Sequence, residues 1–431
     1  MSERPPEAEA AETGELPPAT TGRGNTPPDR VDGQSLGALA GAFLTQGAAA
    51  FGFIGYSLLA PGLAEATGLP ERDFGLAFSF IFAGTALASP LSGAMMRRFG
   101  SVGTMAITLG GMALFALIAL FGTWPAVMAS AFIYGLFYGP YGPANITVVT
   151  RRTPHHRVGL FLSIRQCGVS LAGAGGGFLL PGLLLAVGWQ AGVWAMTIVL
   201  GLALIATLAA APIFRVEAEV TRPHTGPRPP LVHRIVNRLI LPSNLRLLGW
   251  ISISLAVMHT TLFTFVYIYL LEVVGLSPVV AGQFFAIIQL TAILGRPLMG
   301  WISDRTGNPE TVLIGIAITA SIAVAAVITT DASTPIWFIY VIAFVAGISG
   351  NSWSPIFAMI VGRRAPPGEL AEITGRAYSL AAMGWTLSPL IMWSLIELSG
   401  GYTLPFAAVA VLGCIASLAL VRDRAQITRT P

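Results

Sequence analysis

Long apolar segments recur along the chain from Leu36 onward, separated mostly by short polar stretches. Because the hydrocarbon core of a bilayer is about 30 Å thick, a helix needs about 20 such residues to cross it. Segments of about this length predict twelve transmembrane helices. They run approximately over 36–63, 74–96, 103–121, 125–149, 158–186, 191–214, 247–271, 279–302, 311–330, 336–361, 374–398 and 403–421. The pattern therefore predicts an all-α integral membrane protein.

A polar stretch over 215–246 divides the predicted helices into six and six. It holds Pro, His and several arginines, and we interpret it as a linker between an N-terminal bundle over 36–214 and a C-terminal bundle over 247–421. Residues 1–35 are rich in Pro, Glu, Gly and Thr without an apolar run, so we expect a disordered tail. They match neither a signal peptide nor a transit peptide. Residues 422–431 are interpreted as a second tail.

Composition excludes a water-soluble enzyme, since 54% of the residues are hydrophobic and only 10% are charged, against about a quarter in soluble chains. All 24 basic residues are arginine, which indicates a composition bias, so the formal charge of +4 carries no inference of nucleic-acid binding. The two cysteines, Cys167 and Cys414, lie in apolar segments. They suggest neither a disulfide framework nor a thiolate metal site, and we expect no metal and no cofactor.

The arginines also indicate how the chain crosses the membrane. Loops that stay in the cytoplasm hold an excess of positive charge. Placing the N-terminus in the cytoplasm leaves only Arg72 on the outer side, and almost all the other arginines fall on the inner side. We therefore expect both termini and the linker to be cytoplasmic, in the inner membrane of a bacterium.

The two halves repeat one another, as in many transporter folds. In the second and eighth segments, Leu87, Pro90, Leu91, Gly93, Arg98 and Gly100 match Leu294, Pro297, Leu298, Gly300, Arg305 and Gly307 at a constant offset. Matches between the fourth and tenth and between the fifth and eleventh segments follow in the same order. The halves therefore follow one duplicated plan.

The stretch Gly300-Trp-Ile-Ser-Asp304-Arg305-Thr-Gly307 resembles the Gly-x-x-x-Asp-Arg-x-Gly signature of the major facilitator superfamily. The resemblance implies two pseudo-symmetric six-helix bundles, secondary transport by alternating access and a monomer. It also implies a cytoplasmic gate formed by Asp304 and Arg305. In the first-half counterpart Arg97 replaces the acid. Arg97 and Arg98 are therefore either part of a first-half gate or simply anchors on the cytoplasmic side. The motif residues are Gly93, Arg98, Gly100, Gly300, Asp304, Arg305 and Gly307.

Two shorter stretches resemble particular branches of that superfamily. The stretch around Arg165-Gln166-Cys-Gly168 is similar to a bacterial branch mostly without assigned substrates. The segment Arg296-Pro-x-x-Gly300 is similar to helix eight of monocarboxylate and oxalate/formate carriers, where the matching arginine binds the substrate carboxylate. The fifth segment lacks the Gly-Pro pattern of drug/proton antiporters, which disfavours drug efflux.

Two arginines, Arg165 and Arg296, lie inside apolar segments, where an ionisable group is costly and indicates function. In the resembled fold their helices are neighbours, and no Asp or Glu occurs within the core of any predicted segment. An uncompensated pair of guanidiniums predicts an anionic cargo, because arginine offers forked hydrogen bonds to carboxylate or phosphate. Alternatively, each arginine reaches the interface or bonds a neighbouring carbonyl.

Polar side chains in the predicted pathway helices are further candidates for substrate binding, although each is alternatively a helix-helix hydrogen bond. These candidates are Gln46, Tyr138, Asn145, Gln166, His259, Gln289, Asn351 and Trp353. His259 is the titrating group available for proton coupling. A structural bond from His259 to a threonine is the alternative.

These observations predict a secondary active transporter for a small organic anion such as a carboxylate. Its partners would be the small-molecule substrate, the lipid bilayer and either a co-transported proton or an exchanged anion, with no nucleic acid. An efflux carrier for amphipathic or neutral compounds is the alternative. A membrane-embedded enzyme is disfavoured, because the chain lacks His-Glu-x-x-His and Gly-x-Gly-Asp patterns. A third hypothesis is a transporter-like sensor that moves no cargo.

Overall fold

The computed structural model describes residues 30–154, 157–214, 241–365 and 370–427. Helices and turns account for this part of the chain, which contains no strand. The N-terminal half consists of α2 (Gly33–Leu58), α3 (Ala60–Thr67), η1 (Glu71–Leu76), α4 (Ala77–Ala88), η2 (Ser89–Leu91), α5 (Ser92–Ala116), η3 (Leu117–Phe121), α6 (Trp124–Arg151), α7 (Val158–Val187) and α8 (Trp189–Phe214). The C-terminal half consists of η5 (Ser243–Leu245), α10 (Arg246–Thr260), the π-helical turn η6 (Thr261–Phe265), α11 (Val266–Glu272), α12 (Pro278–Thr306), α13 (Pro309–Ile328), α14 (Ile336–Gly350), α15 (Trp353–Arg364), α16 (Leu370–Ser399) and α17 (Thr403–Ile427).

The predicted transmembrane segments coincide with these helices, which confirms the all-α membrane fold. Ten helical stretches of the described chain are long and apolar enough to cross a membrane. One of them, Glu71–Phe121, spans 51 residues and contains two predicted segments. They meet at Gly100, whose φ of 70° and ψ of 172° interrupt the helix. The predicted segment 125–149 is α6, a helix of 28 residues that is not among the ten.

Parts of the predicted tails and linker lie outside the described residues, namely 1–29, 215–240 and 428–431. Inside the described part, α2 begins directly after Asp32, whose carboxylate caps the helix. Asp32 Oδ1 accepts hydrogen bonds from the backbone N–H of Ser35 at 2.7 Å and from its hydroxyl at 2.8 Å. Because these bonds favour the charged carboxylate, they lower the pKa of Asp32.

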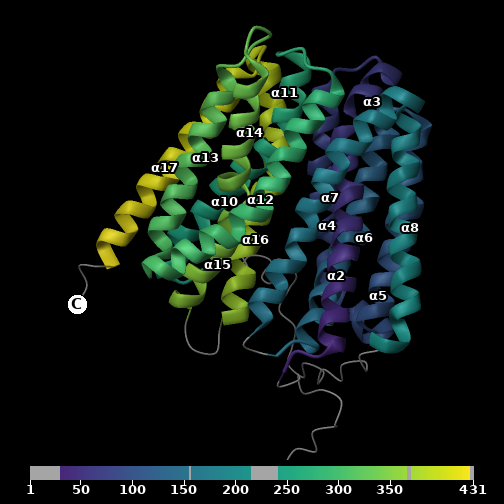
Figure 1. Ribbon diagram of the computed structural model, residues 1–431, viewed down its shortest axis with the longest axis vertical. Coiled ribbons are helices and arrows are strands. Elements are labelled where there is room, and N and C mark those ends of the chain that lie inside the picture. Colours follow the sequence, from purple (N-terminus) through teal and green to yellow (C-terminus); the bar gives the residue numbers. More distant parts are fainter. Residues whose placement is uncertain (1–29, 155–156, 215–240, 366–369, 428–431) are drawn as a thin grey trace, which may run out of the picture.

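Two helical bundles stand side by side, α2–α8 in purple to teal and α10–α17 in green to yellow (Figure 1). Helices α7 and α12 join them, and glycine allows their backbones to touch. A Cβ atom on Gly177 would lie 2.6 Å from the carbonyl oxygen of Gly282, and one on Gly282 would lie 2.3 Å from that of Gly177. A side chain at either position would push the two bundles apart.

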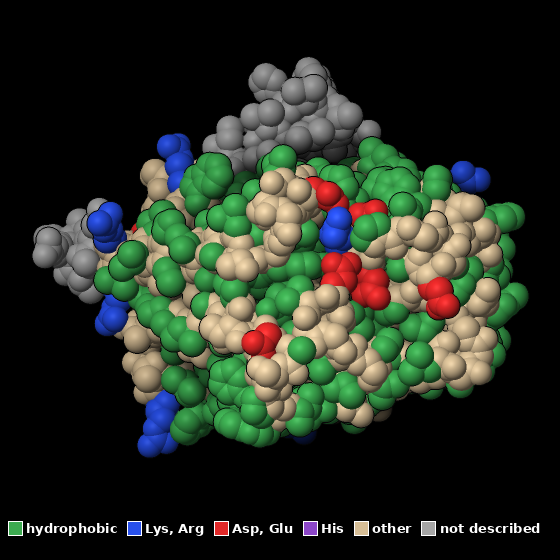
Figure 2. All heavy atoms as spheres, turned by 90° about the horizontal axis from the view of Figure 1, so that it is seen from above, with side chains coloured by type: hydrophobic (Ala, Val, Ile, Leu, Met, Phe, Trp, Pro, Cys, Tyr) green, Lys and Arg blue, Asp and Glu red, His purple; other side chains and the backbone are tan. Residues whose placement is uncertain are grey.

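The two ends of the molecule carry opposite charge. We call one the acidic end; Figure 2 shows it face-on, with acidic side chains gathered around a basic one. Its charged residues are Glu65, Glu71, Arg72, Asp73, Glu272, Asp331 and Glu397. The other, the basic end, holds Arg97, Arg98, Arg151, Arg152, Arg305, Arg363, Arg364, Arg422 and Arg424. This separation is the one expected of a protein oriented by the positive-inside rule.

Side-chain hydrogen bonds between the halves gather toward the acidic end, and we call this set the acidic-end contacts. They are Arg72 Nη2 to Glu397 Oε1 at 2.8 Å, Trp393 Nε1 to Asp73 Oδ1 at 2.7 Å, Ser79 Oγ to Thr386 O at 2.8 Å, the backbone N–H of Arg72 to Glu272 Oε1 at 3.1 Å, and the Tyr267 hydroxyl to Leu58 O at 3.3 Å. The halves are therefore held together at the end opposite their arginine-rich loops.

At the basic end, an ion-pair network ties together helices of the C-terminal bundle. Arg364 at the end of α15 pairs with Glu310 of α13 at 3.1 Å and with Asp423 of α17 at 2.6 Å. The Arg364 side chain is only 10% exposed. Losing the arginine would leave two partly buried carboxylates without their cation.

Candidate functional site

Arg165 lies on α7 with its guanidinium inside the N-terminal bundle, and the residue is 6% exposed. Its Nη2 donates to Gln46 Oε1 of α2 at 2.5 Å, and its Nη1 donates to Gln166 Oε1 at 3.4 Å. Its Nε donates to Asn145 Oδ1 of α6. Every acceptor among the described residues is a neutral amide oxygen, so amide dipoles solvate the positive charge and no described acid cancels it.

Two of the three amide groups that accept from this guanidinium are themselves oriented by hydrogen bonds. Asn145 Nδ2 donates to the hydroxyl of Tyr141 at 2.7 Å and to Thr45 Oγ1 at 3.0 Å. Its oxygen is therefore directed at the arginine. Gln46 Nε2 donates to the hydroxyl of Tyr138 at 3.3 Å, which leaves its oxygen for the arginine in the same way.

Arg296 of α12 is held by a break in the tenth predicted helix. The break separates α14 from α15, and Arg296 Nε donates to the carbonyl oxygen of Asn351 within it at 3.2 Å. Pro355 lies four residues later and has no N–H, so it cannot bond the Asn351 carbonyl as a helix would require. The arginine takes the place of that missing donor.

The two arginines meet at Gln166, across the junction of the halves. Arg165 Nη1 bonds the Gln166 side chain, while Arg296 Nη1 bonds its backbone carbonyl oxygen at 3.1 Å. Among the described residues, no carboxylate pairs with either guanidinium. Two positive groups therefore lie at membrane depth with neutral partners, an arrangement suited to an anion.

His259 lies near the same helix break. Its Nδ1 is 3.4 Å from the carbonyl oxygen of Gly350, and its ring stacks on Phe263 at 5.5 Å between centroids. The expected alternative was a bond to a threonine; the partner is instead the last carbonyl of α14. The π-helical turn η6 follows two residues after His259, and such turns are frequent at functional sites.

The remaining predicted binding residues, Gln289 and Trp353, are buried and make no hydrogen bond to either arginine within the described part of the chain. Gln289 is 1% exposed and packs where α7 meets α12; a Cβ atom on Gly173 would lie 2.7 Å from its Cγ. Its Nε2 is buried and has no hydrogen-bond partner in the described part of the chain. Trp353 is 2% exposed, with its ring 5.7 Å from that of Phe357 and 6.3 Å from that of Trp385. Thus the structure gathers Gln46, Tyr138, Asn145, Arg165, Gln166, Arg296 and Asn351 into one hydrogen-bonded site.

The last glycine of the predicted gate motif in each half forms a turn. Gly100 and Gly307 have φ values of 70° and 64°, a left-handed conformation that favours glycine. Gly93 and Gly300 lie inside α5 and α12. The motif therefore reverses the chain between consecutive transmembrane helices in both halves.

The charged residues of that motif are exposed. Arg98 lies over the ring of Phe99 at 5.4 Å, and Arg305 lies over the ring of Trp301 at 5.3 Å. Within the described ranges, the Asp304 carboxylate makes no hydrogen bond or salt bridge. The gate role of Asp304 and Arg305 stays a prediction.

Sequence reasoning missed the acidic-end contacts. The sequence places Arg72 on the outer side but gives no partner for it. The pairing of Arg72 with Glu397 joins residues 325 positions apart, and no local sequence pattern predicts it. Nor does a tryptophan near a helix end reveal that its indole N–H, as in Trp393, bonds Asp73 across the halves.

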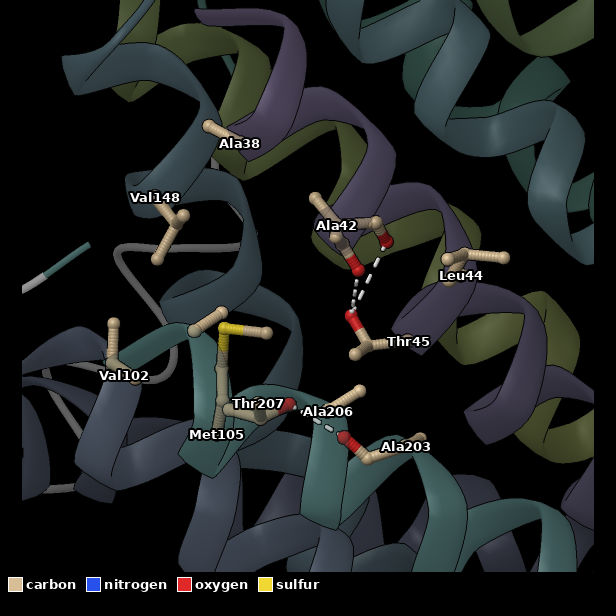
Figure 3. A pocket seen from close by; sticks show the side chains of 12 residues that line it. Ala38, Ala42, Leu44, Thr45, Val102, Met105, Val148, Ala203, Ala206 and Thr207 are labelled. Carbon is tan, nitrogen blue, oxygen red and sulfur yellow. Dashed lines mark hydrogen bonds between the residues drawn. The ribbon is translucent and has the colours of Figure 1, made fainter. Parts of the chain in front are cut away.

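A separate pocket of about 80 Å³ lies within the N-terminal bundle, between α2, α5, α6 and α8 (Figure 3). It is lined by Ala38, Gly41, Ala42, Leu44, Thr45, Val102, Met105, Val148, Ala203, Ala206, Thr207 and Ala210. Its two threonine hydroxyls donate to carbonyls of their own helices, Thr45 to Gly41 at 2.8 Å and Thr207 to Ala203 at 2.7 Å. This pocket contains no charged group and is not suited to an anion.

Comparison with known proteins gives the family of the chain. The model of the Major Facilitator Superfamily matches residues 42–391. The chain belongs to this superfamily. It is a multi-pass membrane transporter and not an enzyme.

Curated relatives of this superfamily member match over part of their length. The probable nitrate/nitrite transporter NarK2 of Mycobacterium tuberculosis is 31% identical over 150 residues, which cover 34% of this chain and 37% of the relative. The 4-hydroxybenzoate transporter PcaK of Pseudomonas putida is 30% identical over 146 residues, 33% of this chain and 31% of the relative. The matches thus span about a third of these relatives.

Solved structures share the fold over nearly the whole chain. The peptide transporter POT in complex with sulfate superposes with a TM-score of 0.72 at 16% identity, covering 94% of this chain and 97% of the other. A variant of the nucleoside transporter NupG gives a TM-score of 0.72 at 14% identity, covering 89% and 99%. At these identities the similarity shows the fold alone.

Proposed function

We propose that the protein is a secondary carrier for a small organic anion such as a carboxylate, which binds at Arg165 and Arg296 and crosses by alternating access. The observation that carries the proposal is the pair of guanidiniums at membrane depth whose described partners are neutral. A charge in this environment is costly, and an anion would offset that cost when it binds.

The guanidiniums retain hydrogen-bonding capacity for such a ligand. Each carries five N–H groups. The bonds described above use three of them in Arg165 and two in Arg296. A carboxylate has two oxygens that accept in the same fork geometry that arginine presents. Donors therefore remain on both sides of the junction for one shared anion.

The names of the partial relatives support an anionic cargo, since nitrate, nitrite and 4-hydroxybenzoate are all anions. The similarity of the Arg296 segment to monocarboxylate carriers favours an organic anion over an inorganic one. The substrate is therefore assigned by class, as a small carboxylate.

The distribution of charge supports an orientation with the basic end in the cytoplasm and both termini inside, in an inner membrane. In that orientation the acidic-end contacts lie on the outer side, and the carrier, which we propose to be a monomer, would have to break them to open outward. Coupling is either proton symport, for which His259 is the titrating side chain, or exchange of anions, which needs none. Uptake measured with and without a pH gradient separates the two.

The test is uptake of radiolabelled carboxylates into proteoliposomes by the wild type and by the double variant Arg165→Gln, Arg296→Gln. The matched control is Arg157→Gln, an exposed arginine at the N-cap of α7. We expect the double variant to lose uptake while remaining monodisperse in detergent, and the control to retain uptake. Intact uptake by the double variant would overturn the proposal. Transport of lipophilic cations or neutral compounds alone would identify the alternative, an efflux carrier for amphipathic or neutral compounds.

A further inference from the structure

A group of aromatic side chains packs next to the arginine site, and we call it the aromatic cluster. Its rings lie 5.5–6.4 Å from their neighbours between centroids. Its members are Phe53 of α2, Phe78 and Phe82 of α4, Tyr138 of α6, His259 of α10, Phe263 of η6, Trp353 of α15 and Trp385 of α16. Both bundles therefore contribute to one aromatic surface.

Three ring contacts cross between the halves. Phe263 lies 6.3 Å from Phe53 and 5.7 Å from Phe78. Phe82 lies 6.0 Å from Trp385 in a tilted arrangement. The cluster thus spans the junction at which alternating access requires the bundles to move.

The same cluster is connected to both guanidiniums. On one side, Gln46 bonds both Arg165 and the hydroxyl of Tyr138. On the other side, Arg296 and His259 bond successive carbonyls of the helix break that lies between α14 and α15. A ligand whose charge lies at the arginines therefore has aromatic rings as its next neighbours.

Four members of the cluster keep part of their surface open. Phe82, Tyr138, His259 and Trp385 are half-buried, whereas the other four are buried. Trp385 has a further property: its Nε1 is buried and finds no hydrogen-bond acceptor among the described residues. A buried indole N–H usually finds a partner, so this donor is available to an oxygen atom of a bound molecule.

We propose that the anion is a planar aromatic carboxylate, whose charged group binds Arg165 and Arg296 while its ring packs against Trp385 and the neighbouring rings of the aromatic cluster. This inference rests on the proposed function and narrows its substrate class. Aromatic rings stack face-to-edge or offset on one another with more stabilisation than their contact area alone provides. A saturated ring of the same size lacks this additional stacking energy, and an inorganic anion has no ring at all.

The test compares four probes by their dissociation constants for the full-length protein in detergent, read from ligand-induced shifts in Tm. The probes are benzoate, cyclohexanecarboxylate, benzamide and nitrate. We expect benzoate to bind at least three-fold more tightly than cyclohexanecarboxylate, with benzamide and nitrate weaker. Trp385→Leu should weaken benzoate more than cyclohexanecarboxylate and so remove the preference between them, because both rings lose contact area but only benzoate loses the ring-ring interaction. Trp385→Phe should weaken benzoate less, because a ring is retained.

Two controls distinguish failure of the ring assignment from failure of the anion assignment. Arg165→Gln should weaken benzoate and cyclohexanecarboxylate by the same factor, whereas Trp337→Leu, at an exposed tryptophan, should change neither. Equal affinity for the two carboxylates in the wild type, or an unchanged preference in Trp385→Leu, would overturn the aromatic proposal alone. Binding of benzamide as tight as benzoate would overturn the anion assignment as well.

Discussion

The hydrogen bond between Trp393 and Asp73 gives a sharp test of how the acidic end is held closed. The indole Nε1 of α16 donates to the Asp73 carboxylate of η1 at 2.7 Å, which joins one half of the transporter to the other. Substitution Trp393→Phe removes the donor and keeps an aromatic ring, although a smaller one. The main effect on the equilibrium between conformations should come from the lost bond.

Its magnitude follows from the charge on the acceptor. Hydrogen bonds to charged groups contribute about 1.5–3 kcal/mol. Both partners are half-buried, so water can replace part of the bond, and we take the lower value of about 1.5 kcal/mol. Because about 1.4 kcal/mol corresponds to a factor of ten, the ratio of closed to open acidic ends should fall about tenfold. A ratio of about 20:1 would become about 2:1.

Distances between spin labels across the acidic end measure this ratio directly. Labels at Ala66→Cys in the N-terminal half and Ala332→Cys in the C-terminal half occupy exposed positions, after Cys167 and Cys414 have been replaced by alanine. We expect a second, longer distance to gain population in the variant. Trp337→Phe, at an exposed tryptophan of the same half, serves as the control. Unchanged distances, or the same change in the control, would refute the reasoning.

Three further substitutions test the packing and the charge of the two bundles. Arg364→Gln leaves two partly buried carboxylates unpaired and should lower the free energy of unfolding by about 2–4 kcal/mol, seen as a lower Tm, while Arg422→Gln at an exposed position should not. Gly177→Leu forces α7 away from α12 and should abolish transport, whereas Gly175→Ala meets no neighbour within 4 Å and should retain it. Gln46→Glu should neutralise the guanidinium that it bonds, and weaken carboxylate binding at least ~10-fold in a Tm-shift titration; unchanged affinity would contradict the charge argument.

The fold could be predicted from sequence because a bilayer leaves few choices to the backbone. Every spanning segment must satisfy its own hydrogen bonds, so apolar runs of about 20 residues are read as helices. Even the irregular turn between the second and third segments has a local signal in Gly100, which adopts the positive φ that the turn needs. Among the predicted transmembrane helices, only α6 is less apolar than the ten described stretches that are apolar enough to cross a membrane. Its many polar and small residues include Tyr138 and Asn145.

The site could be predicted only in part. A charged residue in an apolar segment can be recognised in the sequence, whereas the packing partners of an aromatic residue cannot. Arg165 and Arg296 stand out against their neighbours, and the amides of Gln46 and Asn145 are recognisable as polar residues on pathway helices. Phe82 and Trp385, in contrast, look like any other membrane-buried aromatic residue. That they meet across the halves at 6.0 Å depends on the packing of α4 against α16, which no spacing along the chain encodes.

The break in helix ten shows how a local rule and a distant contact combine. Pro355 has no N–H, so the Asn351 carbonyl, four residues earlier, loses its helical donor. This consequence can be predicted from the sequence alone. That Arg296 fills the vacancy at 3.2 Å depends on how α12 packs against α14. The same guanidinium therefore holds the broken helix and faces the other half through Gln166. An anion that draws Arg296 toward itself would weaken the bond to the break, so substrate binding and the conformation of helix ten should be coupled.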